Sequence, residues 1–575
     1  MSSPLPPADT AILAAQIEAT PGLARLRALH PDAEAIGPDM VGAIVDEASK
    51  FSQAWLGPLN SVADREGCRL EGGRVLTASG HKAAWDAYLA AGWLGIDQPA
   101  QIGGQDLPVF LLAACQELFD RGCIAFGMLA TSQRAAARLL GAHADDATQA
   151  EWLPRLIAGD WGSTICISEP DAGSDVGRIR TMASPLNDGD WSITGEKIWI
   201  SYGDHDLTSR IGHCLLARTP DAPPGAAGLS LFLVPSTIEG PDGETIRNPI
   251  VVRRLEEKLG LHGSPTCALG FEGARGTLIG TPGRGLAQLF TMITTMRLMV
   301  AVQGLSLAGG AVDVALAYAE ERRQGGPADK PPLPIAEHPD IQRLLMGMSA
   351  RVELMRGVIL AAGVQADLAR LEPDPAAREA AQALVGWLLP IAKTLGGEAA
   401  FEVSSDAIQV LGGAGYVKDW PVEQLLRDSR VFTIFEGASG IQALDLLGRR
   451  LRRDGAAGLK AFMAQARADL QAGASVVEAG SLGRTLDLLQ DAADRLAASQ
   501  ADAGAYPFLR LAGLAAMGWI AIRLAALDPA TPQARRLIAV ARYWLQELEP
   551  KAALEHSMAC ADPARLDLFQ AVRRR

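Results

Sequence analysis

Residues 190–201 read DWSITGEKIWIS, and this stretch decides the fold class. Its β-branched and aromatic residues are typical of a strand, and the preceding Asn187, Asp188 and Gly189 predict a hairpin turn. Similar short segments follow in chain order around it, at 163–168 (STICIS), 212–218 (GHCLLAR) and 228–236 (GLSLFLVPS). Several such strands in succession predict a compact antiparallel β domain over residues 161–285.

Helical periodicity flanks this β region on both sides. Apolar residues recur at helical spacing in segments such as 40–60, 107–122, 289–323 and 378–412. The sequence therefore predicts a mainly α protein with a central β domain. We expect an N-terminal helical domain over 1–160, the antiparallel β middle domain over 161–285, a helical bundle over 286–455 and an additional helical domain over 456–575.

Charge and composition limit the partners of the chain. Its 575 residues carry a net charge of −13, and such a surface does not attract nucleic acids or anionic membranes. The longest apolar stretch, 511–522, is too short to span a bilayer, and the N-terminus lacks a basic region followed by an apolar core. We therefore expect a soluble, cytoplasmic protein with no membrane or nucleic-acid partner.

Several common site motifs do not occur in the sequence. The seven cysteines contain no CxxC pair and the eight histidines no HExxH, so we predict neither a disulfide framework nor a metal site. No G-x-G-x-x-G opens a βαβ unit, and neither a P-loop nor a G-x-S-x-G elbow is found. The chemistry must therefore be sought in other patterns.

Three stretches carry chemical groups in a distinctive order. They are 165–175 (ICISEPDAGSD), 193–201 (ITGEKIWIS) and 406–442 (DAIQVLGGAGYVKDWPVEQLLRDSRVFTIFEGASGIQ). Each alone has an ordinary structural interpretation, as a capped turn, a core strand or a helix stop. Together, over roughly residues 40–450, they resemble the acyl-CoA dehydrogenase family of flavoenzymes. Segments such as 51–75 and the extra helices after 455 are similar to a C-terminally extended branch of that family.

The resemblance implies an FAD-dependent oxidation of an acyl-CoA thioester to the trans-2-enoyl-CoA. In this family a glutamate removes the α proton while the β hydride passes to flavin N5, and the matching residue is Glu436. Apolar Phe432, Ile434 and Phe435 would exclude water and make the carboxylate a stronger base. The alternative is that Glu436 is an acid at a helix N-terminus, favoured by the helix dipole.

A second position is relevant to the choice of base. Some family members carry their base on a preceding helix, at the position of Met296, and methionine cannot accept a proton. The neighbouring Arg297 matches an arginine that the family keeps near its active site, and we predict a supporting catalytic role for it.

The resemblance also implies an FAD site and a subunit interface. Residues that match one side of that site are Ile165, Ile167, Ser168, Ser174, Trp199 and Ser201. Residues that match contacts from the neighbouring subunit are Arg322, Gln409 and Gly413, so we expect a homodimer or homotetramer. The sequence departs from the family at Ala438 and Gly440, which stand where relatives have a threonine and a glutamine that touch FAD.

The resemblance implies three partners and leaves two alternatives open. The expected partners are the acyl-CoA substrate, short-chain or 3-methylthiopropanoyl, the FAD cofactor and an electron-transferring flavoprotein. One alternative is an acyl-CoA oxidase that uses O₂. The other is a non-catalytic, nucleic-acid-associated protein with the same fold, but the many acids of the C-terminal block do not favour DNA binding.

Overall fold

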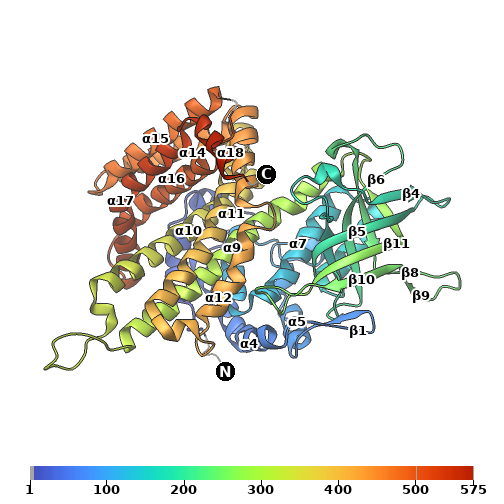
Figure 1. Ribbon diagram of the computed structural model, residues 1–575, viewed down its shortest axis with the longest axis horizontal. Coiled ribbons are helices and arrows are strands. Elements are labelled where there is room, and N and C mark those ends of the chain that lie inside the picture. The colour runs from blue at the N-terminus through green and yellow to red at the C-terminus, as the bar shows by residue number, and fades with distance from the viewer. Residues whose placement is uncertain (1–4, 500, 574–575) are drawn as a thin grey trace. The chain divides into compact units, whose positions relative to one another are not determined.

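The computed structural model describes residues 5–499 and 501–573, and the chain forms two compact units (Figure 1). The first, the bundle unit, comprises the described residues of Met1–Lys50, Pro108–Arg121 and Val300–Arg575. The second, the sheet unit, comprises Phe51–Leu107 and Gly122–Met299. The division into four sequence domains stays a prediction.

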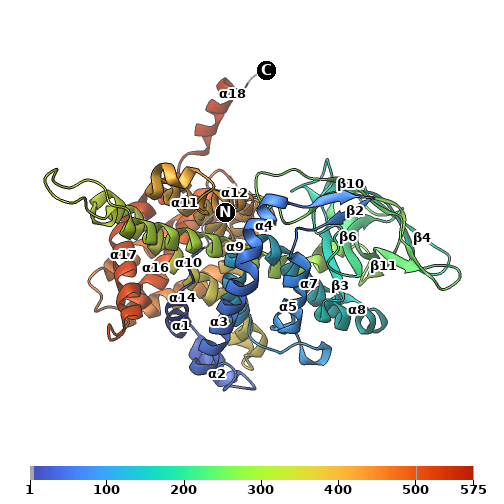
Figure 2. The same cartoon turned by 90° about the horizontal axis from the view of Figure 1, so that it is seen from below.

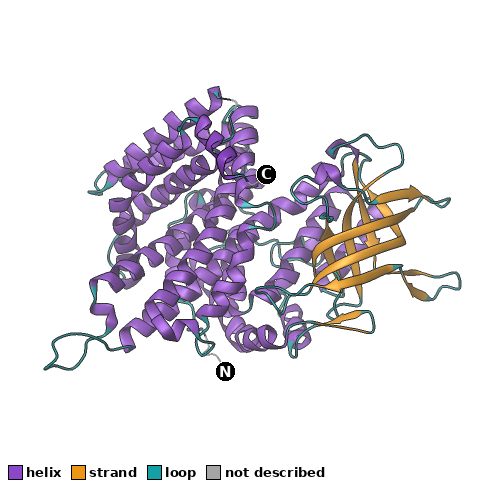
Figure 3. Cartoon of the chain, in the orientation of Figure 1, coloured by secondary structure: helices purple, strands orange, loops and turns teal. Residues whose placement is uncertain are grey.

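A seven-stranded sheet forms the centre of the sheet unit (Figure 3). The strand order is β10-β11-β5-β4-β6-β3, and β7 pairs with both β11 and β6. The strands are β3 (Trp161–Cys166), β4 (Met182–Pro185), β5 (Trp191–Ser201), β6 (Arg210–Arg218), β7 (Leu229–Pro235), β10 (Ile250–Leu255) and β11 (Thr266–Ile279). The predicted hairpin is confirmed, because β4 and β5 pair antiparallel across residues 186–190 and Gly189 has a φ of +92°.

The sheet differs from the expected antiparallel one at its edge and between β4 and β6, where Met182 and Arg218 pair in parallel. Strand β3 runs parallel to β6, with Ile165 opposite Cys214. Parallel neighbours need a long connection, and the chain between β3 and β6 supplies it with the β4–β5 hairpin. A strand-by-strand interpretation cannot reveal this, since direction depends on the order of strands in the sheet.

Both faces of the sheet are covered at β6 and β7, which explains the nearly continuous hydrophobic runs of these two strands. One face contributes Ile193, Leu215 and Phe232 to a buried cluster. The other contributes Leu216 and Leu231 to a cluster with Leu139 and Trp152 of the helices. Leu139 belongs to α7 (Ile124–His143) and Trp152 to α8 (Asp146–Ala158), and this unit also contains α4 (Gly57–Glu66) and α5 (His81–Ala90).

Small hairpins accompany the helices and the sheet of this unit. The pairs are β1 (Arg69–Glu71) with β2 (Arg74–Leu76), and β8 (Thr237–Glu239) with β9 (Thr245–Arg247). The β1–β2 pair lies within residues 1–160, which were predicted to be helical. That prediction was wrong for residues 69–76. Gly72 and Gly73 both have positive φ and form the turn that the pattern missed.

Long helices build the bundle unit. Its larger helices are α9 (Gly285–Glu321, from Val300 onward in this unit), α10 (Pro339–Leu371) and α11 (Pro375–Leu411). Helices α9 and α11 approach closely at glycines, since a Cβ on Gly304 would lie 2.1 Å from the carbonyl oxygen of Gly396. Shorter helices complete the group: α1 (Thr10–Glu18), α2 (Leu23–Leu29), α3 (Pro38–Phe51), α6 (Val109–Gly122), α12 (Val422–Ser429) and α13 (Ser439–Leu444).

The additional C-terminal helices belong to the same unit. They are α14 (Ala457–Ala472), α15 (Ala479–Ala498), α16 (Ala505–Ala525), α17 (Pro532–Ala559) and α18 (Phe569–Val572), and Figure 2 shows α18 projecting from the others. Trp519 of α16 is fully buried and donates from Nε1 to Asp469 of α14 at 2.7 Å. The predicted fold class, mainly α with a central β domain and extra helices, is confirmed.

Two described helices, α9 and α16, are long and apolar enough to cross a membrane by length and composition alone. The apolar window is 94% buried in α9 and 78% buried in α16. From the sequence, the stretch 511–522 was judged too short to span a bilayer. It lies inside α16, which has 21 residues, so length alone does not exclude a span. Core helices of soluble proteins pass the same test when they are mostly buried, as here.

Candidate active site

Glu436 lies in an unusual backbone turn of the bundle unit. A short 3-10 helix over Arg430–Thr433 precedes it, and α13 begins at Ser439 after the N-cap residue Ala438. Glu436 has a φ of +53° and Gly437 a φ of +90°. A left-handed non-glycine residue costs about 1–3 kcal/mol, and such strained residues cluster at functional sites. Glu436 precedes the N-cap, so it is not an acid of the first turn of α13.

Two buried side chains hold the carbonyl groups of this turn. Lys393 of α11 donates from Nζ to the Gly437 carbonyl at 2.8 Å. Gln442 of α13 donates from Nε2 to the Glu436 carbonyl at 3.0 Å and to the Gly437 carbonyl at 3.2 Å. Neither residue was predicted from the sequence, although one lysine in the apolar run LLPIAKTLGG is an unusual signal.

The expected apolar surroundings of Glu436 are present in part. Phe432 is fully buried, and its ring centroid lies 5.8 Å from that of Phe435. Ile434, however, is 56% exposed in the single chain, so its role in excluding water stays a prediction. The 3-10 helix ends at Thr433, so Ile434 and Phe435 lie in the turn that follows it.

The sheet unit brings two of the predicted flavin stretches together. Ile165 lies in β3, Ile167 and Ser168 follow it, and Trp199 and Ser201 lie in β5. Ile198 donates its N–H to the carbonyl of Ser168 at 2.9 Å, and the Thr164 hydroxyl donates to the carbonyl of Ser201 at 2.8 Å. Ser174 is exposed in the loop after β3.

A buried ion pair fixes the loop after β3. Lys197 of β5 donates to Glu169 at 2.7 Å and to the Ile167 carbonyl at 3.1 Å. The Glu169 carboxylate also accepts the hydroxyl of Thr181 and the N–H groups of Thr181 and Arg180. Burial raises the pKa of Glu169, but the Lys197 charge and these hydrogen bonds outweigh it and lower the pKa below its usual value.

The surface beside this ion pair fits a flat aromatic cofactor. Trp199 is 58% exposed although it is a large apolar residue, and its φ is +62°. An exposed indole in a strained backbone conformation offers a face for stacking, and Ser168, Ser174 and Ser201 place hydroxyl groups on the same two stretches. The chemistry of this set matches an isoalloxazine ring with polar edges.

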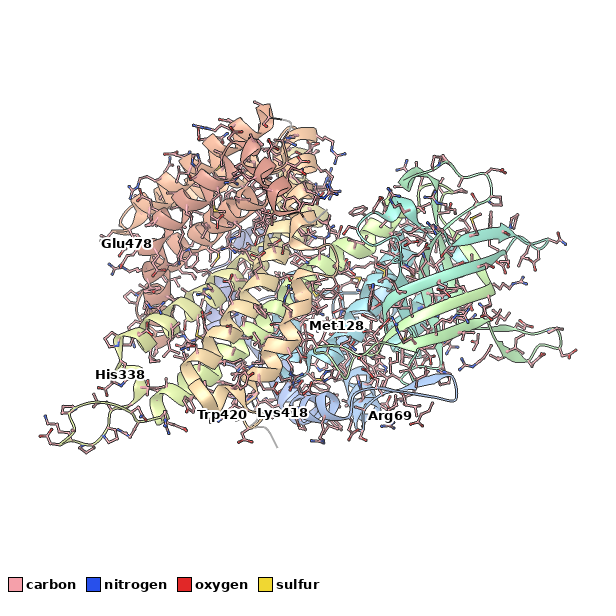
Figure 4. The ribbon with its side chains drawn as sticks, in the orientation of Figure 1. Arg69, Met128, His338, Lys418, Trp420 and Glu478 are labelled. Carbon is pink, nitrogen blue, oxygen red and sulfur yellow. The ribbon has the colours of Figure 1, made fainter. Side chains whose placement is uncertain are left out.

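The residues predicted to contact FAD from a neighbouring subunit lie at one end of the bundle. Arg322 follows α9, Gln409 lies in the last turn of α11, and Gly413 follows that helix. The end of α9 meets the loop after Gly413, since the ring of Tyr318 lies 5.2 Å from that of Trp420. Trp420 is labelled in Figure 4. All of the predicted residues are exposed, so a partner could reach them.

Arg297 lies in the part of α9 that belongs to the sheet unit, whereas Glu436 lies in the bundle unit. Its guanidinium lies 5.8 Å from the ring centroid of Phe290, and the residue is 8% exposed. Buried arginines with an aromatic neighbour are held in position, which suits a supporting residue. Its catalytic role stays a prediction.

One group of potential metal ligands occurs among the described residues, in the C-terminal helices. His556 lies 2.7 Å from the Asp491 carboxylate and 3.7 Å from the sulfur of Cys560. Arg495 also binds this carboxylate, at 2.8 Å. The guanidinium places a positive charge next to the position that a cation would need, so the group is better explained as an ion-pair cluster.

Comparison with known proteins identifies the family. Residues 43–160, 164–274 and 283–451 match the N-terminal, middle and C-terminal domains of acyl-CoA dehydrogenase. The chain is 38% identical over 542 residues to 3-methylmercaptopropionyl-CoA dehydrogenase of Ruegeria pomeroyi, which covers 90% of this chain and 92% of the relative. It is 34% identical to the broad-specificity linear acyl-CoA dehydrogenase FadE5 of Mycobacterium tuberculosis, over 79% of this chain and 80% of the relative.

A solved structure shares the fold. The acyl-CoA dehydrogenase of Bacillus anthracis complexed with FAD matches with a TM-score of 0.75 at 18% identity, over 93% of this chain and 90% of that chain. The chain belongs to the acyl-CoA dehydrogenase family. It is an FAD-dependent oxidoreductase that dehydrogenates the CH–CH group of acyl-CoA thioesters, as predicted.

Proposed function

We propose that Glu436 is the base that removes the α proton of the thioester. The left-handed turn places a single carboxylate between two ordered helical segments, and Gly437 beside it leaves no side chain in the way of a substrate. FAD, when bound, supplies the acceptor for the β hydride. The protein's own residues then have to hold the carboxylate still, orient the thioester and keep the proton at the Glu436 oxygen.

The test is the Glu436→Gln variant loaded with FAD. We expect it to bind acyl-CoA but leave the flavin absorbance unbleached, because an amide cannot accept the proton. Glu402→Gln is the matched control, since Glu402 lies on α11 with a side chain that is 48% exposed. Bleaching at the wild-type rate in Glu436→Gln would show that another group is the base.

The proposed substrates are short acyl-CoAs, including the 3-methylthiopropanoyl thioester. The observation that carries this proposal is the 38% identity to the Ruegeria pomeroyi relative across nearly the full length of both proteins. A turnover panel from C3 to C16 acyl-CoAs together with 3-methylthiopropanoyl-CoA tests it. A maximum kcat/KM for long chains would contradict the proposal. It would favour the substrate range named for the FadE5 relative, a broad-specificity linear acyl-CoA dehydrogenase.

The proposed electron acceptor is an electron-transferring flavoprotein. Reduction of a purified electron-transferring flavoprotein by the enzyme and acyl-CoA should be fast, and oxygen should yield little peroxide. Stoichiometric peroxide in air without the acceptor would instead identify an oxidase.

The proposed assembly is a homodimer or homotetramer in the cytoplasm. Its support is the exposed set Arg322, Gln409 and Gly413, which the family resemblance assigns to the neighbouring subunit's flavin. Light scattering after gel filtration measures the mass, and Arg322→Ala should weaken FAD binding in the assembled protein. A monomer that binds FAD at full affinity would contradict this arrangement.

A further inference from the structure

The backbone turn that carries Glu436 lies against one face of α11. Lys393 and Gly397 are one helical turn apart on this helix and therefore lie on the same face. Lys393 binds the Gly437 carbonyl, and a Cβ on Gly397 would lie 2.8 Å from the Phe432 carbonyl oxygen. The helix thus meets the chain both before and after Glu436.

Helix α11 makes an equally close contact with α9. A Cβ on Gly396 would lie 2.7 Å from the backbone of Ala301 in α9. Adjacent glycines of α11 therefore pack against α9 and against the turn, with no flexible side chain between the backbones. Sites supported by closely packed helices are held more precisely than sites on free loops.

The two side chains that bind the turn are buried. Lys393 and Gln442 are both 0% exposed. The two N–H groups of the Gln442 amide face the carbonyls of Glu436 and Gly437, and its Oε1 has no hydrogen-bond partner among the described residues. A flipped amide would place its oxygen against two carbonyl oxygens, so only one orientation is favourable.

Such groups are expensive to keep inside a protein. Burying an ammonium or an amide costs stability that an apolar residue of the same size would not cost. Their donors converge on two successive carbonyl groups, those of the peptides that directly follow Glu436 and Gly437, whose φ angles are +53° and +90°. The pair therefore acts on the direction of the Glu436 side chain.

We propose that Lys393 and Gln442 are positioning residues that hold the Glu436 turn in its left-handed conformation and so aim the carboxylate at the substrate α carbon. This inference rests on the proposed role of Glu436 as base. It assigns no proton transfer to Lys393 or to Gln442.

The experiment compares Gln442→Met and Lys393→Met, which keep side-chain length and remove the donors. The matched controls are Gln490→Met and Lys551→Met, because these residues make side-chain contacts on the C-terminal helices instead. FAD content, kcat, KM and the isotope effect with α-deuterated acyl-CoA are measured for each. The Glu436→Gln enzyme provides the reference for a lost base.

We expect both variants to bind FAD as the wild type does and to lose about 10- to 100-fold in kcat, because a misplaced base slows proton removal. KM should change little, and the α-deuterium isotope effect on kcat should increase. A structural role alone would lower FAD content or stability without changing the isotope effect. The Gln442 variant decides the question if Lys393→Met does not fold.

Two outcomes separate the inference from the proposed function. If Glu436→Gln is inactive while folded Gln442→Met or Lys393→Met turns over at the wild-type rate, the positioning role is overturned and the base stands. If Glu436→Gln turns over at the wild-type rate, the base assignment itself fails.

Discussion

Replacing Lys197 by methionine should destabilise the sheet unit strongly. The side chain of Lys197 is 0% exposed and that of Glu169 is 7% exposed, and they form an ion pair of 2.7 Å. Removing one partner of a buried pair leaves an uncompensated charge, which costs about 3–5 kcal/mol. Because the hydrogen bonds from Arg180 and Thr181 remain, we expect the lower end, about 3 kcal/mol, or roughly 100-fold in the unfolding equilibrium.

The effect should depend on pH in a defined direction. The native pKa of Glu169 is lowered, so its contribution to stability is present above the unfolded pKa and is lost as the pH falls through the native pKa. Without Lys197, the pKa of Glu169 rises, and the buried carboxyl group becomes neutral on acidification. The stability difference between wild type and variant should therefore shrink as the pH falls from 7 toward about 4.

Thermal and urea unfolding, followed by circular dichroism and by FAD release, measure this difference. Lys82→Met is the control, since Lys82 and Asp86 form an exposed pair worth about 0–1 kcal/mol. Adding Glu169→Gln to Lys197→Met should restore part of the stability, because no charge is then buried. Equal stability of Lys197→Met and Lys82→Met from pH 4 to 8 would refute the reasoning.

Three further outcomes follow from other parts of the chain. Trp199→Ala should weaken FAD binding about 3- to 10-fold in equilibrium dialysis, since stacking contributes about 0.5–1.5 kcal/mol. Unchanged affinity would show that the indole does not contact FAD. Gly397→Val should lower stability by about 1–3 kcal/mol in thermal unfolding, because its Cβ would lie 2.8 Å from the Phe432 carbonyl oxygen; a variant as stable as wild type would contradict this packing. Burial raises the pKa of Cys214 and of Cys267 to about 12, so iodoacetamide at pH 8 should label neither before unfolding. Rapid labelling of the folded protein, seen by mass spectrometry, would argue against their burial.

Periodicity in the sequence was sufficient to predict a helical region, a sheet and a second helical region in that order. The change from helical spacing to β-branched runs predicted the sheet, and the Asn-Asp-Gly turn predicted its β4–β5 hairpin. The parallel pairing of β3 with β6 could not be predicted, because a local pattern contains no information on which strands become neighbours. The β1–β2 hairpin was missed because each of its strands has only three residues.

The sequence motifs pointed to residues expected to contact substrate and cofactor. They did not point to the residues that support these contact residues. Glu436 and Trp199 were found by resemblance, and both have left-handed backbones that no pattern of residue types predicted. Lys393 and Gln442 lie 43 residues before and 6 residues after Glu436, respectively, and only the fold brings their donors to one turn. Supporting residues of this kind depend on tertiary packing, so a sequence motif does not identify them.

Helix α16 has a consequence for synthesis of the protein. Its 21 residues are mostly apolar, and they are made before α17, which packs along it and includes the buried Leu545 and Leu548. Until α17 leaves the ribosome, this apolar helix lacks one of its principal partners, and exposed surfaces of this kind aggregate or bind chaperones. A chain that stops before Pro532 should therefore accumulate in insoluble form even though every residue proposed for catalysis is present.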